Sequence, residues 1–308
     1  MRIVRQNDNI SGGVVATIGM FDGVHLGHRS VINYLKSEAT KEGLQSAVIT
    51  FSQHPQTILN PQSAVRQILS LSDKIKALEE TGIDNLILLD FNENLASLSA
   101  RQFIEVIRDT YSVKTLIVGY DHHFGHNRGE SLADYQRYGN ELGVNVIPTP
   151  EYSPSGEHIS SSTIRKTLQS GDVSKAATML GRHFAIHGTV VHGLQNGRKI
   201  GYPTANIQPD TPDLIIPNNG VYAVKVMLGN KEYGGMLNIG SRPTLCNNGE
   251  TSIEVNIFNF NEDIYGKEIT VTFIERLRNE RKMASLADLT EQLAADKVQS
   301  QKILKQTI

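Results

Sequence analysis

The stretch TIGMFDGVHLGH, residues 17–28, places three glycines and two histidines within twelve residues. It continues the apolar run Val14–Ile18 and precedes a segment of helical pattern, Ser30–Glu42. Glycine lets the backbone turn sharply and approach a ligand closely, and a helix that starts there points free N–H groups at an anion. The order of strand, glycine turn and helix therefore predicts a phosphate site with His25 and His28 at its mouth. A plain glycine turn with two surface histidines is the alternative.

Outward from this stretch, short apolar runs alternate with helical segments from Gly13 to about Gly181. The runs are Val14–Ile18, Ala47–Phe51, Leu86–Leu89, Leu116–Val118 and Val144–Ile147, and the helical segments are Ser30–Glu42, Ser72–Glu80, Ser99–Tyr111 and Ser131–Leu142. In the third helix, Ser99 and Gln102 predict a capping box, and the expected apolar face is Phe103, Val106, Ile107 and Tyr111. Apolar strands separated by helices indicate an α/β domain, a Rossmann-like parallel sheet covered by helices on both faces.

After His183 the hydrophobic period changes to two, which is typical of strands. The expected strands are Ala185–His192, Val221–Leu228, Glu232–Ile239, Ser252–Phe258 and Glu268–Ile274. Since no helical pattern separates them, we expect an antiparallel β-barrel or sandwich. A final helix is predicted over Ser285–Leu304, packed on the barrel by a stripe of Leu286, Leu289, Leu293 and Val298. The domain boundary is expected at Gly181–His183, giving domains 1–181 and 183–308.

Composition limits the function classes. Thirty Lys and Arg against 32 Asp and Glu give a formal charge of −2, which disfavours nucleic acid as the main partner. Cys246 is the single cysteine, which excludes an intramolecular disulfide and Cys-based zinc clusters. No apolar run approaches the roughly 18 residues of a membrane span. We therefore expect a soluble, cytoplasmic protein with no membrane partner, while homo-oligomers are possible but not derivable from the sequence.

The second half contains glycine-rich segments but no P-loop, since the closest stretch, residues 193–199, has the wrong spacing. Gly188 and Gly193 bracket one segment, and GRKIGYPTAN, residues 197–206, follows. Glycines at this density suit a flap over phosphates, and the side-chain oxygens of Thr204 and Asn206 suit Mg²⁺. Ordinary turns between strands remain the alternative.

Three segments of the first half resemble the nucleotidyltransferases, and the FAD synthetase branch in particular: GMFDGVHLGH at 19–28, GYDHHFG at 119–125 and ISSSTIR at 159–165. His122 departs from the usual aromatic residue and Ser162 from the usual threonine. The resemblance implies a nucleotide and phosphate site made by Gly19, Phe21, Asp22, His25, His28, Asp121, Ser161, Ser162 and Arg165. His28 would lie nearest the α-phosphate and act in catalysis. His122, His123 and His126 could instead form a metal site. We favour the interpretation that they are solvated loop histidines.

The second half resembles the riboflavin kinases through GYPTAN (201–206), GVYAV (220–224), GMLNIGSRPT (235–244), DIYGK (263–267) and LRNER (277–281). This resemblance implies that Glu254 is the general base and that Arg278 and Glu280 contact the flavin. It also implies a phosphate-binding role for Gly188, Gly193, Gly201, Thr204 and Asn206, with Thr204 and Asn206 holding Mg²⁺. Met283 stands where phenylalanine is common, which would loosen the stacking on the flavin.

Together the two resemblances identify the chain as similar to the bifunctional riboflavin kinase/FAD synthetases. They imply that riboflavin is phosphorylated by ATP to FMN, with ADP released, and that FMN is then adenylylated by a second ATP to FAD and pyrophosphate. Mg²⁺ would accompany ATP in both reactions. Two alternatives remain: a nucleotidyltransferase of other specificity, such as a cytidylyltransferase, and a flavin-binding regulator with one inactive half.

Overall fold

The computed structural model describes residues 1–6, 8–53, 65–119, 124–125, 129–150, 159–193, 197, 200–241 and 251–306. The chain divides into two compact units, Met1–Ser161 and Ser162–Ile308. This division lies before the boundary expected at Gly181–His183. Helices α7 (Ser161–Ser170) and α8 (Val173–Leu180) therefore belong almost entirely to the second unit.

The first unit contains a six-stranded sheet in the order β1-β4-β3-β2-β5-β6, and every neighbouring pair is parallel. The strands are β1 (Arg2–Val4), β2 (Val14–Ile18), β3 (Gln45–Phe51), β4 (Asn85–Leu89), β5 (Val113–Val118) and β6 (Asn145–Pro148). The predicted parallel sheet is confirmed. The edge strand β1 was not predicted, since three residues are too few to show a period.

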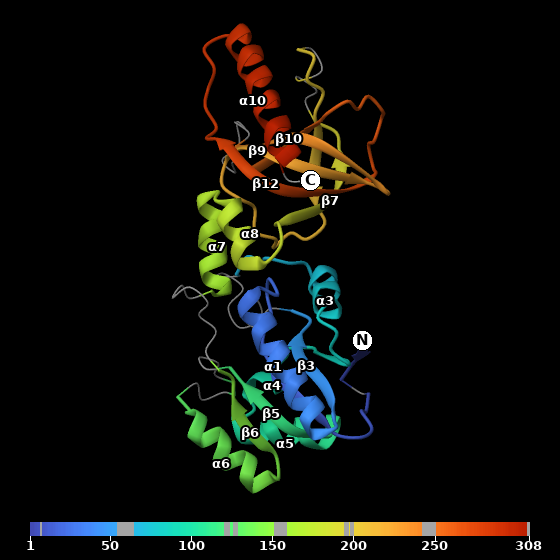
Figure 1. Cartoon of the computed structure of the whole chain (residues 1–308), viewed down its shortest axis with the longest axis vertical. Helices are drawn as coiled ribbons and strands as arrows, with labels where there is room; N and C mark the ends of the chain where they lie inside the picture. Colours follow the sequence, from blue (N-terminus) through green and yellow to red (C-terminus); the bar gives the residue numbers. More distant parts are fainter. Residues whose placement is uncertain are drawn as a thin grey trace. The chain divides into compact units, whose positions relative to one another are not determined.

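Helices cover both faces of this sheet (Figure 1). Buried residues of α1 (Leu26–Glu42) and α3 (Leu71–Glu79) share one apolar cluster with the sheet, while α5 (Ala100–Tyr111) and α6 (Leu132–Leu142) share the other. The short helix α4 (Glu93–Ser97) precedes α5. Because side chains alternate along a strand, each of the strands β2 to β6 supplies residues to both clusters, while the edge strand β1 supplies Val4 to one. This two-sided burial explains the unbroken apolar runs in the sequence.

The capping box at the start of α5 is confirmed, with Ser99 and Gln102 satisfying each other's backbone. The predicted apolar face is wrong at one position, because Val106 is 40% exposed and Ile104 is buried in its place. Ile104 lies three residues before the buried Ile107, so it shares that helical face.

The second unit is a closed barrel of six antiparallel strands in the order β10-β11-β8-β7-β12-β9. The strands are β7 (Ala185–Val191), β8 (Ala205–Pro209), β9 (Gly220–Leu228), β10 (Lys231–Ser241), β11 (Thr251–Ile257) and β12 (Glu268–Arg278). The predicted antiparallel barrel is confirmed. Strand β8 was missed because its first residues lie within the glycine-rich segment that we expected to be a loop.

Backbone and side-chain hydrogen bonds join α7 and α8 to the barrel. The N–H of Asn218 donates to the Leu168 carbonyl at 3.2 Å, and Arg276 donates to the Ser170 carbonyl at 3.1 Å. The hydroxyl of Ser174 donates to the Ile274 carbonyl at 3.2 Å. These bonds explain why both helices belong to the second compact unit.

Helix α10 (Leu286–Gln306) packs on the barrel, as expected. Its Leu304, with Leu293 and Ile303 beside it, shares an apolar cluster with Met236, Phe258 and Ile274. The predicted stripe is wrong at Leu286 and Val298, which are 64% and 67% exposed. The buried face carries Asp296 and Ser300 instead, so two polar residues broke the apolar pattern that the sequence showed.

Candidate active sites

The glycine turn of residues 19–27 follows β2, at the carboxyl edge of the parallel sheet. Strand β2 pairs with β3 on one side and with β5 on the other, so the strand order changes direction there. In open α/β sheets, ligands bind at the carboxyl ends of the strands at such a reversal. The topology therefore places the predicted phosphate segment where this fold binds ligands.

His25 is the N-cap of α1, and its Nδ1 accepts a hydrogen bond from the backbone N–H of His28 at 3.3 Å. An accepting Nδ1 carries no proton, so the neutral ring holds its proton on Nε2. Gly27 permits this arrangement, because a Cβ there would lie 3.1 Å from the His25 ring. The cap thus fixes which nitrogen of His25 can donate a hydrogen bond to a ligand.

The rings of His25 and His28 stack, with centroids 3.6 Å apart and planes 18° from parallel. The Phe21 ring lies 5.0 Å from His28 in a tilted contact. The structure therefore brings the two predicted histidines together at the first turn of α1, where free N–H groups and the positive end of the helix dipole favour an anion.

The backbone of this turn is held in an uncommon conformation. Phe21 and Val24 have φ of 49° and 38°, and Gly23 has φ of 86°. Only glycine adopts this left-handed region at no cost, and other residues keep it when the surrounding structure imposes it. The turn is therefore strained at two side-chain-bearing positions beside the histidines.

Asp22 supplies part of that constraint. It is buried, and its carboxylate accepts hydrogen bonds from the backbone N–H groups of Ile68 and Leu69 at 3.0 and 3.2 Å. Its carbonyl accepts a hydrogen bond from the Ser161 hydroxyl at 2.9 Å. The structure therefore turns the Asp22 side chain toward the protein and gives it a role in shaping the turn.

Two further predicted residues of the turn also serve packing. The Phe21 ring is buried under the turn and lies against Gly19, where a Cβ would be 3.1 Å from the ring. The N–H of Gly19 donates to the Ile49 carbonyl at 3.1 Å, continuing the sheet beyond β2. Phe21 therefore packs against His28, and Gly19 leaves room for the Phe21 ring.

The remaining residues predicted for this site are distributed differently. Asp121, together with His122, His123 and His126, lies outside the described residues. Ser162 is exposed and Arg165 half-buried on the first turns of α7, within the second unit. Across the ranges that the structure describes, no three His, Cys, Asp or Glu side chains gather as metal ligands would.

In the barrel, Glu254 lies at the centre of a row of polar side chains. The strand register pairs it with Asn238 on β10 and with Asn206 on β8. Residues directly opposite one another on neighbouring strands project from the same face. Asn238 was not predicted as a site residue, and only the register between β10 and β11 reveals it.

Thr204 completes this group, because its hydroxyl donates to the Glu254 carboxylate at 3.3 Å. The segment before β8 is held by Asn256, whose side-chain amide donates to the Pro203 carbonyl at 2.7 Å. The structure therefore brings together three of the predicted kinase residues, Thr204, Asn206 and Glu254. Their hydroxyl, amide and carboxylate oxygens form a hard donor set.

The three predicted phosphate glycines lie in different environments. At Gly193 a Cβ would meet the Asn206 amide at 2.1 Å, so this glycine lets Asn206 lie against the backbone. At Gly188 a Cβ would meet the Gln208 carbonyl at 2.4 Å, which makes it a glycine of the close β7–β8 pairing. Gly201 has φ of 81° and open space around it, as a turn requires.

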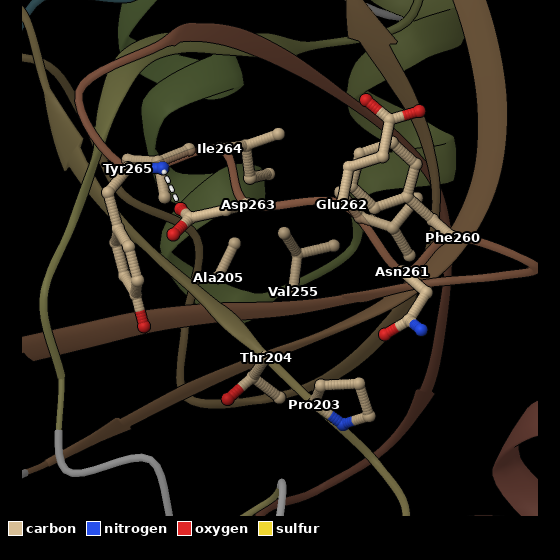
Figure 2. Close-up of a pocket in the computed structure, with 12 residues that line it drawn as sticks. Pro203, Thr204, Ala205, Val255, Phe260, Asn261, Glu262, Asp263, Ile264 and Tyr265 are labelled. Atoms are coloured by element: carbon tan, nitrogen blue, oxygen red, sulfur yellow. Dashed lines mark hydrogen bonds between the residues drawn. The ribbon is translucent and has the colours of Figure 1, made fainter.

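A cavity of about 260 Å³ adjoins Thr204 (Figure 2). Val190, Ala205, Val255 and Ile257 form its apolar wall, and the segment 260–265 forms the opposite side. In that segment the Asp263 carboxylate accepts the backbone N–H of Tyr265 at 3.1 Å, the bond drawn in Figure 2. A mostly apolar hollow with a few polar groups is the usual form of a small-molecule site.

Arg278 and Glu280 do not lie side by side as two free groups. Arg278 binds the buried carboxylate of Asp296 on α10 through Nε and Nη2, at 3.0 and 2.7 Å. Glu280 accepts a hydrogen bond from the Asn219 amide at 3.2 Å and lies against Gly240. Asp296 was not predicted, because an acidic residue among helix charges is ordinarily solvated.

Comparisons with known proteins match each half of the chain to a family. Residues 7–163 match the FAD synthetase family, and residues 180–304 match the riboflavin kinase family. The bifunctional riboflavin kinase/FMN adenylyltransferase of Bacillus subtilis is 38% identical over 92% of this chain and 90% of its own length. The enzyme of that name from Escherichia coli is 36% identical over 97% of this chain and 96% of its own.

A solved structure also matches the whole chain. A crystal structure from Streptococcus pneumoniae, described as a macrolide-efflux protein, has a TM-score of 0.89 and 31% identity, covering 98% of this chain and 99% of that one. In the part of the present chain that the structure describes, no helix combines the length and the apolar character of a membrane span.

Proposed function

The chain belongs to the family of bifunctional riboflavin kinase/FMN adenylyltransferases, and from this premise we propose which residues of each unit carry its two reactions. It phosphorylates riboflavin to FMN with ATP and adenylylates FMN with ATP to give FAD. The residue assignment rests on one observation: each unit contains its own group of polar side chains. The first unit has a histidine pair at the start of α1, and the second has a Thr–Asn–Glu group on the barrel.

For the kinase, Glu254 is the general base. The ribityl 5′-hydroxyl of riboflavin loses its proton to the Glu254 carboxylate, its oxygen bonds to the γ-phosphorus of ATP, and the bond to the β-phosphate oxygen breaks to release ADP. Support comes from the half-buried position of Glu254 between Asn206 and Asn238, with Thr204 donating to it. A positioned base of this kind contributes about 10²–10⁴-fold to a rate.

The oxygens of Thr204 and Asn206 would hold Mg²⁺, which fits their chemistry as hard donors. When bound with ATP, the cation neutralises negative charge on the phosphates. Glu254 then acts on the riboflavin hydroxyl and not on the cation. Because Gly193 has no side chain, Asn206 can lie against the backbone there. Gly188 and Gly201 contribute through strand pairing and a turn, so their effect on phosphate binding is indirect.

The cavity beside Thr204 is our proposed site for the adenosine of the kinase ATP. Its wall is apolar at Val190, Val255 and Ile257, and polar groups of the 260–265 segment lie opposite. An apolar wall with polar groups at the rim suits a purine ring, which is apolar on its faces and polar at its edge. The adjoining Thr204 would then lie on the phosphate side.

We place the flavin at the segment that carries Arg278 and Glu280. Since Arg278 is bound to Asp296, it acts in this proposal by fixing the backbone of the segment to α10. The carboxylate of Glu280 is positioned by the Asn219 amide. Met283, two residues beyond LRNER, would give the ring a softer contact than phenylalanine.

For the adenylyltransferase, a phosphate oxygen of FMN attacks the α-phosphorus of ATP and pyrophosphate leaves. The reaction needs positioning and charge stabilisation and no protein nucleophile. His28 stabilises charge on the α-phosphate, and His25 donates from Nε2 because its Nδ1 is the cap acceptor. Asp121, Ser161, Ser162 and Arg165 keep, in this proposal, the nucleotide-binding role that the resemblance implies.

The proposal divides the activities between residues 1–181 and 183–308. The two family matches leave residues 164–179 between them, close to that division. The exclusion of nucleic acid is also proposed, on the formal charge of −2, and a cytoplasmic location, on the single cysteine Cys246. The test is chromatography of products from riboflavin, ATP and MgCl₂, with EDTA and CTP as controls. FMN and then FAD are expected, with neither after EDTA and no flavin cytidine dinucleotide from FMN and CTP.

A further inference from the structure

A buried lysine lies beneath the strained turn of the adenylyltransferase unit. Lys74 is on α3, is 7% exposed, and donates to the Phe51 carbonyl at 2.8 Å. Its ammonium also lies 3.5 Å from the Met20 carbonyl and 3.4 Å from the Thr50 hydroxyl. Phe51 ends β3 and Met20 follows β2, so one side chain joins the carboxyl ends of two neighbouring strands.

The contacts of Lys74 lie next to the residues of the strained turn. Thr50 donates its hydroxyl to the Met20 carbonyl at 3.1 Å, so Lys74 and Thr50 share that carbonyl. Met20 directly precedes Phe21, the first residue of the turn with positive φ. Asp22, the next residue, lines a small hollow together with Lys74 and Met20. Lys74 and Thr50 therefore hold Met20, and the backbone N–H groups of Ile68 and Leu69 hold Asp22, on either side of Phe21.

Burial of this charge has a cost, which argues that it is retained for a reason other than stability. Burial lowers the pKa of Lys74 from 10.5 to about 8, with the Asp22 carboxylate acting in the opposite direction. Asp22 is the charged group that acts on Lys74 among the described residues. A methionine of similar length would fill the same space without burying an ammonium, but it would leave the Phe51 carbonyl and the Asp22 carboxylate without this partner.

We propose that Lys74 is a positioning residue for FMN adenylylation, holding the Met20 and Phe51 carbonyls and facing Asp22 so that the strained turn presents His25 and His28. The proposal rests on the proposed role of that histidine pair. A strained turn persists only where its surroundings impose it, and a small displacement of a positioned group can cost about 10²-fold in rate. Lys74 does not touch substrate in this account.

The test compares Lys74→Met, Lys74→Arg and the control Lys76→Met in the full-length protein. Lys76 is exposed on the same helix. We expect Lys74→Met to lower kcat for FAD formation from FMN roughly tenfold to a hundredfold, with riboflavin phosphorylation unchanged. Lys76→Met should leave both rates unchanged. Lys74→Met with more than half of wild-type adenylylation would overturn the proposal, provided that His28→Ala abolishes it. If His28→Ala also retains activity, the histidine assignment fails instead.

A pH profile separates this role from simple packing and does not depend on Lys74→Met folding. Adenylylation by the wild type should fall as pH rises through about 8, because Lys74 then loses its proton. Lys74→Arg stays charged, so its residual adenylylation should lack that fall. A wild-type profile that is flat from pH 7 to 9.5, or a fall that persists unchanged in Lys74→Arg, would overturn the proposal.

Discussion

Two side chains, Glu254 and His28, carry the proposed chemistry, and each owes its position to local geometry. Glu254 projects from β11 because its neighbours Ile253 and Val255 are buried in the barrel. His28 lies on the first turn of α1 because His25 caps that helix through its side chain. In both cases an ordinary rule of strands or helix ends places a reactive group.

Replacing Glu254 by glutamine keeps its size and removes the proton acceptor. Phosphorylation of riboflavin should fall by about 10²–10⁴-fold while supplied FMN is still adenylylated. Product chromatography measures both rates, with the exposed Glu268→Gln as the matched control. A fall of less than tenfold, or weakened riboflavin binding with normal turnover at saturation, would make Glu254 a binding residue.

His28→Ala should have the opposite pattern. Loss of one preorganised donor beside the α-phosphate costs about 10²–10³-fold, so FAD formation falls and FMN accumulates. His183→Ala, at an exposed position, serves as the control and should leave both rates unchanged. An unaltered rate of FAD formation in His28→Ala would show that His28 is a surface histidine.

Lys74 should also affect how the free energy of unfolding depends on pH. Its folded pKa of about 8 lies below the unfolded value of 10.5, so between these pH values the unfolded chain binds more protons. The free energy of unfolding contributed by this group therefore rises as pH increases from about 8 to 10.5. Urea unfolding should show that the free energy of unfolding of the wild type increases relative to that of Lys74→Met as the pH rises across this range. A constant difference would contradict the lowered pKa.

At the scale of helices and strands, periodicity predicted the elements and missed what breaks it. Strand β8 was hidden because Gly201 and Pro203 indicate a loop, although the strand that begins at Ala205 pairs with β11 at its start and with β7 from Asn206 onward. The face of α10 was misplaced because Asp296 is polar, and only its partner Arg278 explains its burial. Burial of polar residues depends on contacts distant in sequence, which a periodic pattern cannot show.

The same distinction applies to the site residues: local spacing predicts some of them, and others depend on contacts distant in sequence. The pairing of His25 with His28 could be predicted from their spacing of three on a helix start. Asn238 could not, because its position opposite Glu254 depends on the register of two strands. Lys74 could not either, since a lysine on a helix is normally exposed and its burial follows from the ends of β2 and β3.

The Arg278–Asp296 pair should couple α10 to the kinase unit. Asp296→Ala leaves a partly buried guanidinium without its partner, so the free energy of unfolding should fall by roughly 3 kcal/mol or somewhat less. We expect a raised KM for riboflavin as well, since the Arg278 segment is the proposed flavin side. Chemical unfolding and kinase kinetics test this, with the exposed Glu291→Ala as control. Equal stability of the two variants would show that the pair contributes nothing.

At the scale of the whole molecule, two units with separate cores predict two separable activities. The second unit includes α7 and α8, whose Val173, Ala176, Met179 and Leu180 are buried. A fragment that begins at Ser162 should therefore fold and make FMN. A fragment that begins at His183 loses these side chains, and full burial of a valine, methionine or leucine side chain is worth about 1.5–3 kcal/mol. Its melting temperature should be clearly lower, and equal melting temperatures would show that α7 and α8 do not stabilise the barrel.

The most direct test of the account is complementation between the two active-site variants. His28→Ala and Glu254→Gln are mixed with riboflavin, ATP and MgCl₂, and the flavins are separated by chromatography. We expect His28→Ala alone to stop at FMN, Glu254→Gln alone to leave riboflavin, and the mixture to produce FAD as FMN passes from one variant to the other. FAD at the wild-type rate from either variant alone, or a mixture that yields only FMN, would contradict the assignment of the two reactions to these two sites.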